Sequence, residues 1–393
     1  MTSLPDELVE EVFLRLPPDE PAALVRASLV SKPWFGLLTG PAFRGRYREF
    51  HGAPPMLGFL YNRPYGYSRR KDLTPLFVST TKFRVRIPHF TQRTHQSLDA
   101  WDCRHGMVLL GDNGYCPPML AVWDPMTGCA RELYGPEEYL DPADSYKIAV
   151  LCAVSGCDHR SCHAVRPFKM VYVGVKTRDG ECVALAFVSS PDMGDWTKAS
   201  DPEREEWEEP CSDLDLANDA FIHSMPAVLV DDALHFLLGY KYDDGRAGIL
   251  KYSLSSDSLS FIDAPLAMSV VARASILMAM KDGRLGFAHV DRLTLHVWSR
   301  QVDSDGGASW THGRIVDLKS LLHIKYPKSR ARLIGSVEGG DIIFVTADLG
   351  VYEIDLNTLE WKERRKRENL HALYPYMSFY NPPERVIPGD AAH

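Results

Sequence analysis

The 393-residue sequence lacks any run of about 18 uncharged apolar residues, the length that a membrane-spanning helix requires. It also lacks an excess of positive charge, because 52 Asp and Glu outnumber 44 Lys and Arg and give a net charge of −8. Its first residues, MTSLPDELVEE, are acidic almost at once, unlike a secretory signal or a transit peptide. We therefore expect no membrane partner, and no nucleic-acid partner bound through a broad basic face.

Cysteine is scarce, with eight residues in the chain and no export signal beside them. This usage is typical of reduced thiols, so we expect the protein in the cytoplasm, the nucleus or both. The sequence contains no GxxxxGK, no GxGxxG after a predicted strand, no GxSxG and no HExxH. Because such motifs place phosphate-binding backbone, nucleophiles or metal ligands at fixed spacings, their absence predicts a non-catalytic protein without a cofactor.

The first fifty residues predict three or four short helices. Ser3 can cap the first helix, and apolar residues then recur at helical spacing: Leu8, Val9, Val12, Phe13 and Leu16. Asp19 and Ser31 are the expected caps of the second and third helices, and Gly40-Pro41 precedes a fourth. Since a unit below about 40–50 residues cannot bury this much apolar surface by itself, part of it should face a partner or the rest of the chain.

Two segments of this region, LPDELVEEVFLRLP and LVRASLVSKPWFGLL, resemble an F-box, and together they cover about a tenth of the chain. Pro21 and Pro33 depart from the family pattern, but both fall in first helical turns, where proline is tolerated. The positions that match the pattern are Leu4, Pro5, Glu7, Leu8, Val12, Leu16, Pro17, Leu24, Val30, Ser31, Lys32 and Trp34.

The resemblance implies that residues 1–50 form an F-box domain that docks onto a Skp-type adaptor, which links to a cullin and a RING subunit in an SCF ubiquitin ligase. It gives Trp34 a share in both the core of the domain and the adaptor contact. The alternative is a three-helix cap that packs on the rest of the chain. The residues that the resemblance assigns to the adaptor contact are Leu4, Pro5, Leu8, Val12, Leu16, Pro17, Leu24, Val30 and Trp34.

Residues 51–385 have the pattern of a large all-β domain, and we expect residues 386–393 to be a disordered tail. Short runs rich in Val, Leu, Phe and Tyr alternate with Gly, Asp, Asn and Pro turns. Three Asp-Gly pairs indicate β-hairpins with type I′ turns, because glycine readily adopts the positive φ that these turns require: Asp179-Gly180, Asp244-Gly245 and Asp282-Gly283.

A looser repeat recurs five times: a strand containing an aromatic residue, a polar turn and a second strand. The aromatic residues are Trp123, Phe187, Tyr252, Trp298 and Tyr352, and their spacings of 64, 65, 46 and 54 are near or above one propeller blade. A further blade is expected at MLGFLYN and PLFVST, and LYPYMSFYN is a strand that can pair back and close the ring. We therefore predict a β-propeller of about six blades.

This region resembles the β-propeller regions of plant F-box proteins, especially those of grasses, in phrases such as PPMLGFLYN, CDHRSCH and YPYMSFYNPP. Clean kelch or WD signatures do not recur in step. The resemblance implies that the propeller binds a protein substrate, whose identity depends on loop tips that the sequence does not arrange in space.

The best metal candidates are Cys157, His159, Cys162 and His163, with Cys152 nearby, because zinc favours thiolate and imidazole ligands. Their spacing is tighter than that of the usual zinc knuckles, so the favoured interpretation is a polar loop between two strands of a blade, without a metal.

Two charged segments stand out as well. The basic run at 362–367 is either a nuclear localisation signal, a patch for an acidic partner or a solvated turn. The acidic stretch at 200–219 predicts a mobile loop between blades rather than a general acid/base pair.

Three functions are compatible with these patterns. The preferred one is a substrate-recognition subunit of an SCF-type ubiquitin ligase, which itself makes no bond and works by holding a substrate near the ubiquitin-charged enzyme. The second is a hydrolase-like propeller enzyme with a helical cap, which would require convergent carboxylates or a metal at the central channel. The third is an F-box scaffold that acts outside ubiquitination.

Overall fold

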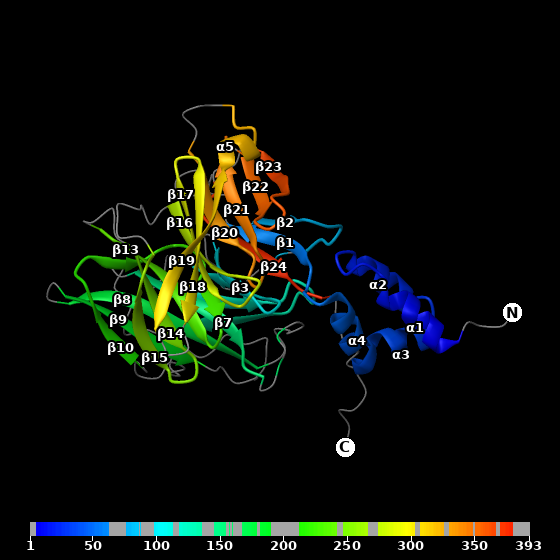
Figure 1. Cartoon of the computed structure of the whole chain (residues 1–393). Helices are drawn as coiled ribbons and strands as arrows, with labels where there is room; N and C mark the ends of the chain where they lie inside the picture. Colours follow the sequence, from blue (N-terminus) through cyan, green and yellow to red (C-terminus); the bar gives the residue numbers. More distant parts are fainter. Residues whose placement is uncertain are drawn as a thin grey trace, which may run out of the picture.

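The computed structural model describes residues 5–62, 76–85, 87, 98–112, 118–135, 145–154, 157, 159, 167–178, 181–189, 212–241, 247–265, 274–302, 307–325, 330–348, 350–366 and 370–379. These residues form four short helices and then an all-β domain of six sheets (Figure 1). The sheets are the blades of a six-bladed β-propeller, as the sequence predicts. The expected tail at 386–393 lies outside the described residues.

The helices are α1 (Asp6–Leu14), α2 (Pro21–Ser28), α3 (Lys32–Thr39) and α4 (Pro41–His51). Ser31 caps α3 as predicted, because its side chain accepts a hydrogen bond from the backbone N–H of Trp34 at 3.3 Å. Asp19 does not cap α2. The N-cap of α2 is Glu20, whose side chain makes no capping bond, and Pro21 supplies the first turn with a preset φ. The predicted cap Ser3 lies outside the described residues.

The blades follow one another along the chain, apart from the first, which combines both ends of the propeller. Blade 1 contains β1 (Met56–Tyr61), β2 (Leu76–Ser79) and β24 (Leu373–Met377). Blade 2 contains β3 (Asp99–Arg104), β4 (Met107–Gly111), β5 (Met119–Trp123) and β6 (Ala130–Tyr134). Blade 3 contains β7 (Ser145–Cys152), β8 (Phe168–Arg178), β9 (Glu181–Ser189) and β10 (Ser212–Leu216). Blade 4 contains β11 (Ala220–Ile222), β12 (Val228–Val230), β13 (Ala233–Tyr240), β14 (Ala247–Ser253) and β15 (Ser258–Asp263).

The last two blades are separated by the short helix α5 (Leu318–Leu321). Blade 5 contains β16 (Ser275–Ala279), β17 (Leu285–Asp291), β18 (Thr294–Val302) and β19 (Ala308–Asp317). Blade 6 contains β20 (Arg332–Ser336), β21 (Ile342–Ala347), β22 (Gly350–Asp355) and β23 (Trp361–Lys366).

The ring is closed by β24, which pairs antiparallel with β1 so that Leu373 lies opposite Tyr61. This confirms the prediction for the described part of LYPYMSFYN, in which Leu373–Met377 pair back onto the first blade. Closure removes the two free sheet edges that an open array would expose to other chains. It also brings the end of the propeller next to α4, because only four residues separate that helix from β1.

The aromatic repeat corresponds to one strand position in each blade. Its five residues lie on β5, β9, β14, β18 and β22, the third strands of blades 2 to 6 in chain order when β12, which lies off the main strand order of blade 4, is not counted. The hairpin at Asp282-Gly283 is not a type I′ turn. Met280 and Arg284 face each other across a three-residue loop in which Gly283, at φ +83°, has a positive φ and Asp282 does not. Asp179-Gly180 and Asp244-Gly245 lie outside the described residues, although Arg178 pairs with Glu181 as a two-residue hairpin requires.

The core of the propeller consists of six apolar clusters, and each one fills the interface between two neighbouring blades. Phe344 of blade 6 and Phe59 of blade 1, for example, lie in one cluster with ring centroids 6.1 Å apart. Because all six interfaces are filled, the blades form a closed and rigid frame. Among the described helices, none is long and apolar enough to cross a membrane.

Candidate functional site

The helical unit presents large apolar side chains to solvent on α1 and directly after α2. Leu8 is 52% exposed and Val12 59%, while Leu29 is 77% and Val30 65% exposed. Leu8 and Val12 are four residues apart, so they lie on the same side of α1. The adjacent side of α1 is also apolar, with Val9 and Phe13 buried in the helical core. A short helix that is apolar on both sides has one surface to bury against something else.

The residues that the F-box resemblance assigns to an adaptor have three different environments. Pro5, Leu8, Val12, Pro17 and Val30 are exposed, whereas Leu16 and Trp34 are half-buried. Leu24 is buried in the helical core and can act only by holding α2 in place. Leu4 lies outside the described residues. The sequence did not assign Leu29 to this contact, although it is the most exposed large apolar residue among those that the structure describes.

Trp34 contributes to the core of the helical unit. Its ring packs edge-on against Phe13, with centroids 5.0 Å apart and planes at 81°. This is a favourable arrangement for two aromatic rings. Substitution of Trp34 would therefore disturb the fold of the unit as well as any contact that its exposed part makes.

The helical unit is fixed to the propeller through α4 and the segment after β24. Phe379 is buried in the same apolar cluster as Phe43 and Tyr47 of α4. Tyr47 in turn donates a hydrogen bond from its hydroxyl to the carbonyl oxygen of Leu16 at 2.8 Å. Burial raises the pKa of Tyr47 well above its ordinary value, so this hydroxyl keeps its proton. The link orients the helices relative to the blades, and Figure 1 shows the chain running from β24 toward α4.

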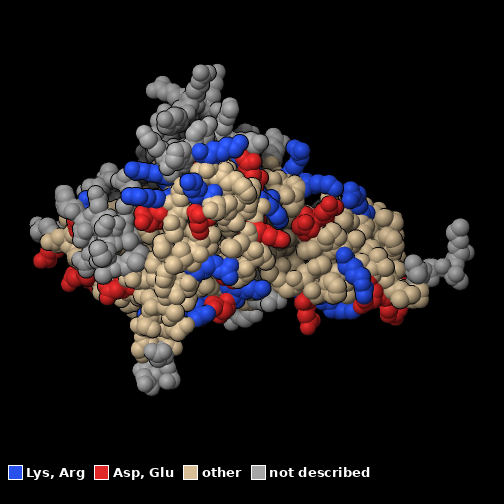
Figure 2. Space-filling view, turned by 45° about the horizontal axis from the view of Figure 1, so that its top comes forward, with Lys and Arg blue, Asp and Glu red and all other residues tan. Residues whose placement is uncertain are grey.

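A cavity of about 690 Å³ lies at the axis of the propeller on the side of the helical unit. Its walls include Asp19 of the helical unit and Pro54 of the linker, together with residues of all six blades. Charged residues from several blades line it: Arg104, Lys281, Glu338, Asp341, Glu353, Lys362 and Arg364. On the face shown in Figure 2, the Lys and Arg side chains are intermixed with Asp and Glu.

Arg104 occupies the centre of the ring. Its Nη1 donates to Asp102 at 3.1 Å, its Nη2 donates to Glu338 Oε1 at 2.7 Å, and its Nη2 also donates to the carbonyl oxygen of Ala227 at 2.8 Å. These partners belong to blade 2, the turn between the first two strands of blade 6, and blade 4. Since blades 2, 4 and 6 alternate around a six-bladed ring, these bonds cross the axis. Arg104 and its partners are referred to below as the axial cluster.

Both carboxylates of the axial cluster also accept hydrogen bonds from backbone N–H groups. Val150 donates to Asp102 at 2.9 Å and Leu229 donates to Glu338 at 3.0 Å. Burial raises the pKa of Asp102, although the Arg104 charge and the N–H donors oppose that rise. Burial alone would lower the pKa of Arg104, but the charges of Asp102 and Glu338 outweigh it and raise the pKa above its ordinary value. The cluster is a hydrogen-bonded ion network that ties blades together.

Two of the four metal candidates fall within the described residues. Cys157 and His159 lie with Cys152, the last residue of β7, so that one ligand atom of each is within 4.8 Å of the others. Cys162 and His163 lie outside the described residues. The sequence signal placed Cys152 only as a neighbour, whereas the structure makes it the third member of this group.

Residues 362–366 of the basic run at 362–367 belong to strand β23 rather than to a solvated turn, and Arg367 lies outside the described residues. Arg364 pairs with Glu353 at 2.7 Å, and Arg365 donates to the hydroxyl of Tyr61 at 2.7 Å with its guanidinium over that ring. The Arg364 pair therefore lies within blade 6, whereas Arg365 connects blade 6 to blade 1.

The comparisons with known proteins concern the two parts of the chain separately. Residues 1–44 match the F-box domain family, so the chain carries an F-box domain at its N-terminus, which includes α1 to α3 and the start of α4. F-box domains generally bind Skp-type adaptors. No curated protein matches the sequence.

Solved structures similar to the chain include three distant ones. The WD40 domain of SCAP from fission yeast has 14% identity and a TM-score of 0.35, with 71% of this chain and 56% of that chain covered. TolB from Acinetobacter baumannii has 11% identity and a TM-score of 0.39, with 84% of this chain and 69% of that chain covered. Oligopeptidase B from Trypanosoma brucei has 12% identity and a TM-score of 0.34, with 71% and 35% covered. The chain thus spans little more than half of the SCAP domain, and likeness at these TM-scores carries no functional argument.

Proposed function

We propose that this protein is the substrate-recognition subunit of an SCF-type cullin-RING ubiquitin ligase, active in the cytoplasm, the nucleus or both. Its F-box binds a Skp-type adaptor, and the propeller binds a protein substrate. The observation that carries the proposal is the exposed apolar surface formed by Leu8, Val12, Leu29 and Val30 in a segment that matches the F-box family. Burying such side chains in an adaptor groove gives roughly 1.5–3 kcal/mol for each fully covered residue.

The link between helices and blades supports the second half of the proposal. A receptor without chemistry of its own works by positioning, which requires that the substrate surface be held at a constant distance from the adaptor. Phe379, buried between α4 and the end of the propeller, provides such a connection. The axial cavity, which Asp19 and Pro54 border, is a concave surface on the side of the helical unit and is the place where we expect a substrate segment to bind.

The adaptor contact is tested by co-purification with a Skp-type adaptor. The double variant Leu8→Ala/Val12→Ala should lose at least tenfold in affinity while keeping its circular dichroism spectrum and melting temperature, since both side chains are exposed. The matched control is Val302→Ala/Ile315→Ala, which removes two similarly exposed residues from blade 5 and should bind like wild type. Equal binding of wild type and the α1 variant would overturn the assigned contact.

Degradation and scaffolding are separated by affinity capture with and without a proteasome inhibitor. A ligase receptor should retain ubiquitin-modified proteins whose amount rises with the inhibitor and falls in the α1 variant. A scaffold outside ubiquitination would retain partners that do not respond to the inhibitor.

The alternative of a propeller enzyme requires available carboxylates or a metal at the axis. The two carboxylates of the axial cluster, Asp102 and Glu338, are both engaged by Arg104 and by backbone N–H groups. Because these two carboxylates are engaged and residues 1–44 match the F-box family, we favour the receptor over the enzyme.

A further inference from the structure

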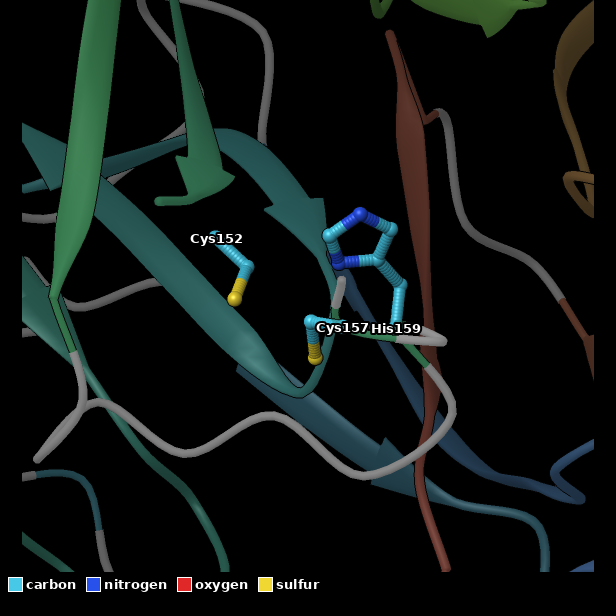
Figure 3. Close-up of side chains that lie close together, drawn as sticks. All are labelled: Cys152, Cys157 and His159. Carbon is cyan, nitrogen blue, oxygen red and sulfur yellow. The ribbon is translucent and has the colours of Figure 1, made fainter. Parts of the chain in front are cut away.

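Two cysteines and one histidine come together beside the axial cavity, where the chain leaves β7. Cys152 is buried at the end of that strand, Cys157 is half-buried and His159 is exposed. One ligand atom of each lies within 4.8 Å of the others (Figure 3). In a tetrahedral zinc site, bond lengths of about 2.0–2.3 Å place the ligand atoms about 3.5–3.8 Å apart. The three side chains are therefore close to the separation that one ion imposes.

The backbone around the group holds its members in place. The N–H of Cys152 donates to His105 Nδ1 at 3.3 Å, and the N–H of Cys157 donates to the carbonyl oxygen of Val154 at 3.3 Å. The ring of His159 stacks on that of His105, with centroids 4.2 Å apart and planes at 13°. His105 belongs to the two-residue turn between β3 and β4, so the group is braced by the neighbouring blade. Such bracing lowers the cost of assembling a metal site.

The donor set selects the kind of ion. Thiolate and imidazole ligands suit zinc, whereas magnesium, calcium and manganese prefer oxygen ligands. We propose that Cys152, Cys157 and His159 bind a zinc ion, with a water molecule or a further donor in the fourth position. Cys162 and His163 form no part of the proposal, because they lie outside the described residues.

The position of the ion gives it a structural consequence. His105 and His159 both line the axial cavity. A zinc ion would tie the segment that follows β7 to the end of that strand, and so would set the shape of the cavity wall where blades 2 and 3 meet. This proposal is independent of adaptor docking, since Leu8 and Val12 belong to α1, a different part of the chain.

The test uses the full-length chain, purified without chelators and equilibrated with stoichiometric zinc. Native mass spectrometry and elemental analysis should find one zinc per chain, and X-ray absorption at the zinc edge should find two sulfur ligands at about 2.3 Å. Cys157→Ser and His159→Ala should each weaken zinc binding at least tenfold. The matched control is Cys129→Ser, which changes an exposed cysteine of blade 2 outside the group and should keep one zinc per chain.

Folding is checked in the same samples by melting temperature without zinc, which should agree among wild type and variants because Cys157 and His159 are not fully buried. An apo mass at stoichiometric zinc would overturn the proposal. Zinc that remains in both variants, or a zinc site without sulfur ligands, would also overturn it. So would a mass 2 Da below the reduced value in wild type that is absent from Cys157→Ser, which would indicate a disulfide at Cys157 instead.

Discussion

Phe379 packs edge-on against Tyr47, with ring centroids 6.1 Å apart and ring planes at 77°. The two residues come from the opposite ends of the chain, one directly after the last strand of the propeller and the other from α4. The β1–β24 pairing closes the ring, and the chain that follows β24 enters the helical core at Phe379. The same strand therefore closes the propeller and attaches the helices to it. The orientation of the F-box relative to the propeller therefore depends on the closure of the ring.

Replacing Phe379 by alanine should weaken this connection. Loss of a buried phenylalanine costs about 3–5 kcal/mol, and we expect that loss to fall mainly on α4 and its contact with the propeller. Hydrogen exchange of the α4 amides should become faster, whereas the amides of blades 2 to 5 should be unaffected. Phe261→Ala on β15, where the ring is partly exposed, is the control and should leave α4 unchanged. Unchanged exchange in α4 of the Phe379 variant would show that other contacts hold the helices.

Val9 and Val12 form a matched pair on α1, one buried and one exposed. Val9→Ala should lower the free energy of unfolding by about 2 kcal/mol because it leaves a cavity in the helical core. Val12→Ala should change it by no more than about 0.5 kcal/mol, yet it should weaken adaptor binding. Urea denaturation and adaptor titration of the two variants give the measurement. A Val12 variant that loses stability but binds normally would contradict the assignment of the two sides of α1.

The axial cluster should be sensitive to the removal of its cation. Arg104→Met leaves the buried carboxylate of Asp102 without its partner, which typically costs about 3–5 kcal/mol. Adding Asp102→Asn should recover part of that loss, because the uncompensated charge disappears and the two sites are coupled. Arg284→Met, which breaks an ion pair with Asp282 at the surface, is the control and should have no measurable effect. Strictly additive losses at Arg104 and Asp102, measured by urea denaturation at pH 7, would show that the cluster does not act as a unit.

Stability should fall in mild acid through buried histidines such as His235. Burial, together with the positive charges of Lys251 and Arg300, lowers the pKa of His235 to about 4. Between about pH 6.5, which is the ordinary pKa of histidine, and about pH 4, His235 binds a proton in the unfolded chain but not in the folded chain. The contribution of His235 to the free energy of unfolding is therefore complete above about pH 6.5 and is lost as the pH falls. The loss from His235 should reach about 2–3 kcal/mol near pH 4.5. The urea midpoint of His235→Gln should fall less between pH 7 and pH 4.5 than that of the wild type. An equal fall in both proteins would mean that other groups govern the acid response.

Local signals were sufficient for the elements and for the blade repeat. Ser31 caps α3 because a cap bonds the backbone of its own helix, and the five repeated aromatic residues mark third strands because each blade uses the same local pattern. The failures were local as well. Asp19 was expected to cap α2, but the helix begins one residue later than that requires, and the loop at Gly283 contains one residue more than a type I′ turn.

The sequence predicted the candidate sites only in part, because some of their residues are far apart along the chain. Cys152, Cys157 and His159 were noticed because they are close in sequence, whereas the bracing His105 comes from another blade. The bond between Arg104 and Glu338 joins residues 234 positions apart and has no pattern that a window of sequence would detect. Leu29 was missed because its exposure depends on where α2 ends.

By itself, the sequence determined the order of helices and strands, the F-box segment and the approximate number of blades, because these depend on capping, periodicity and turn chemistry between near neighbours. Only the tertiary structure decided which apolar residues of the helical unit remain exposed, which charges meet at the axis and which thiols face one histidine. Those relationships arise when a closed ring brings blades 2, 4 and 6 to one axis and places the last strand beside α4, and no interaction between near neighbours in the chain specifies them.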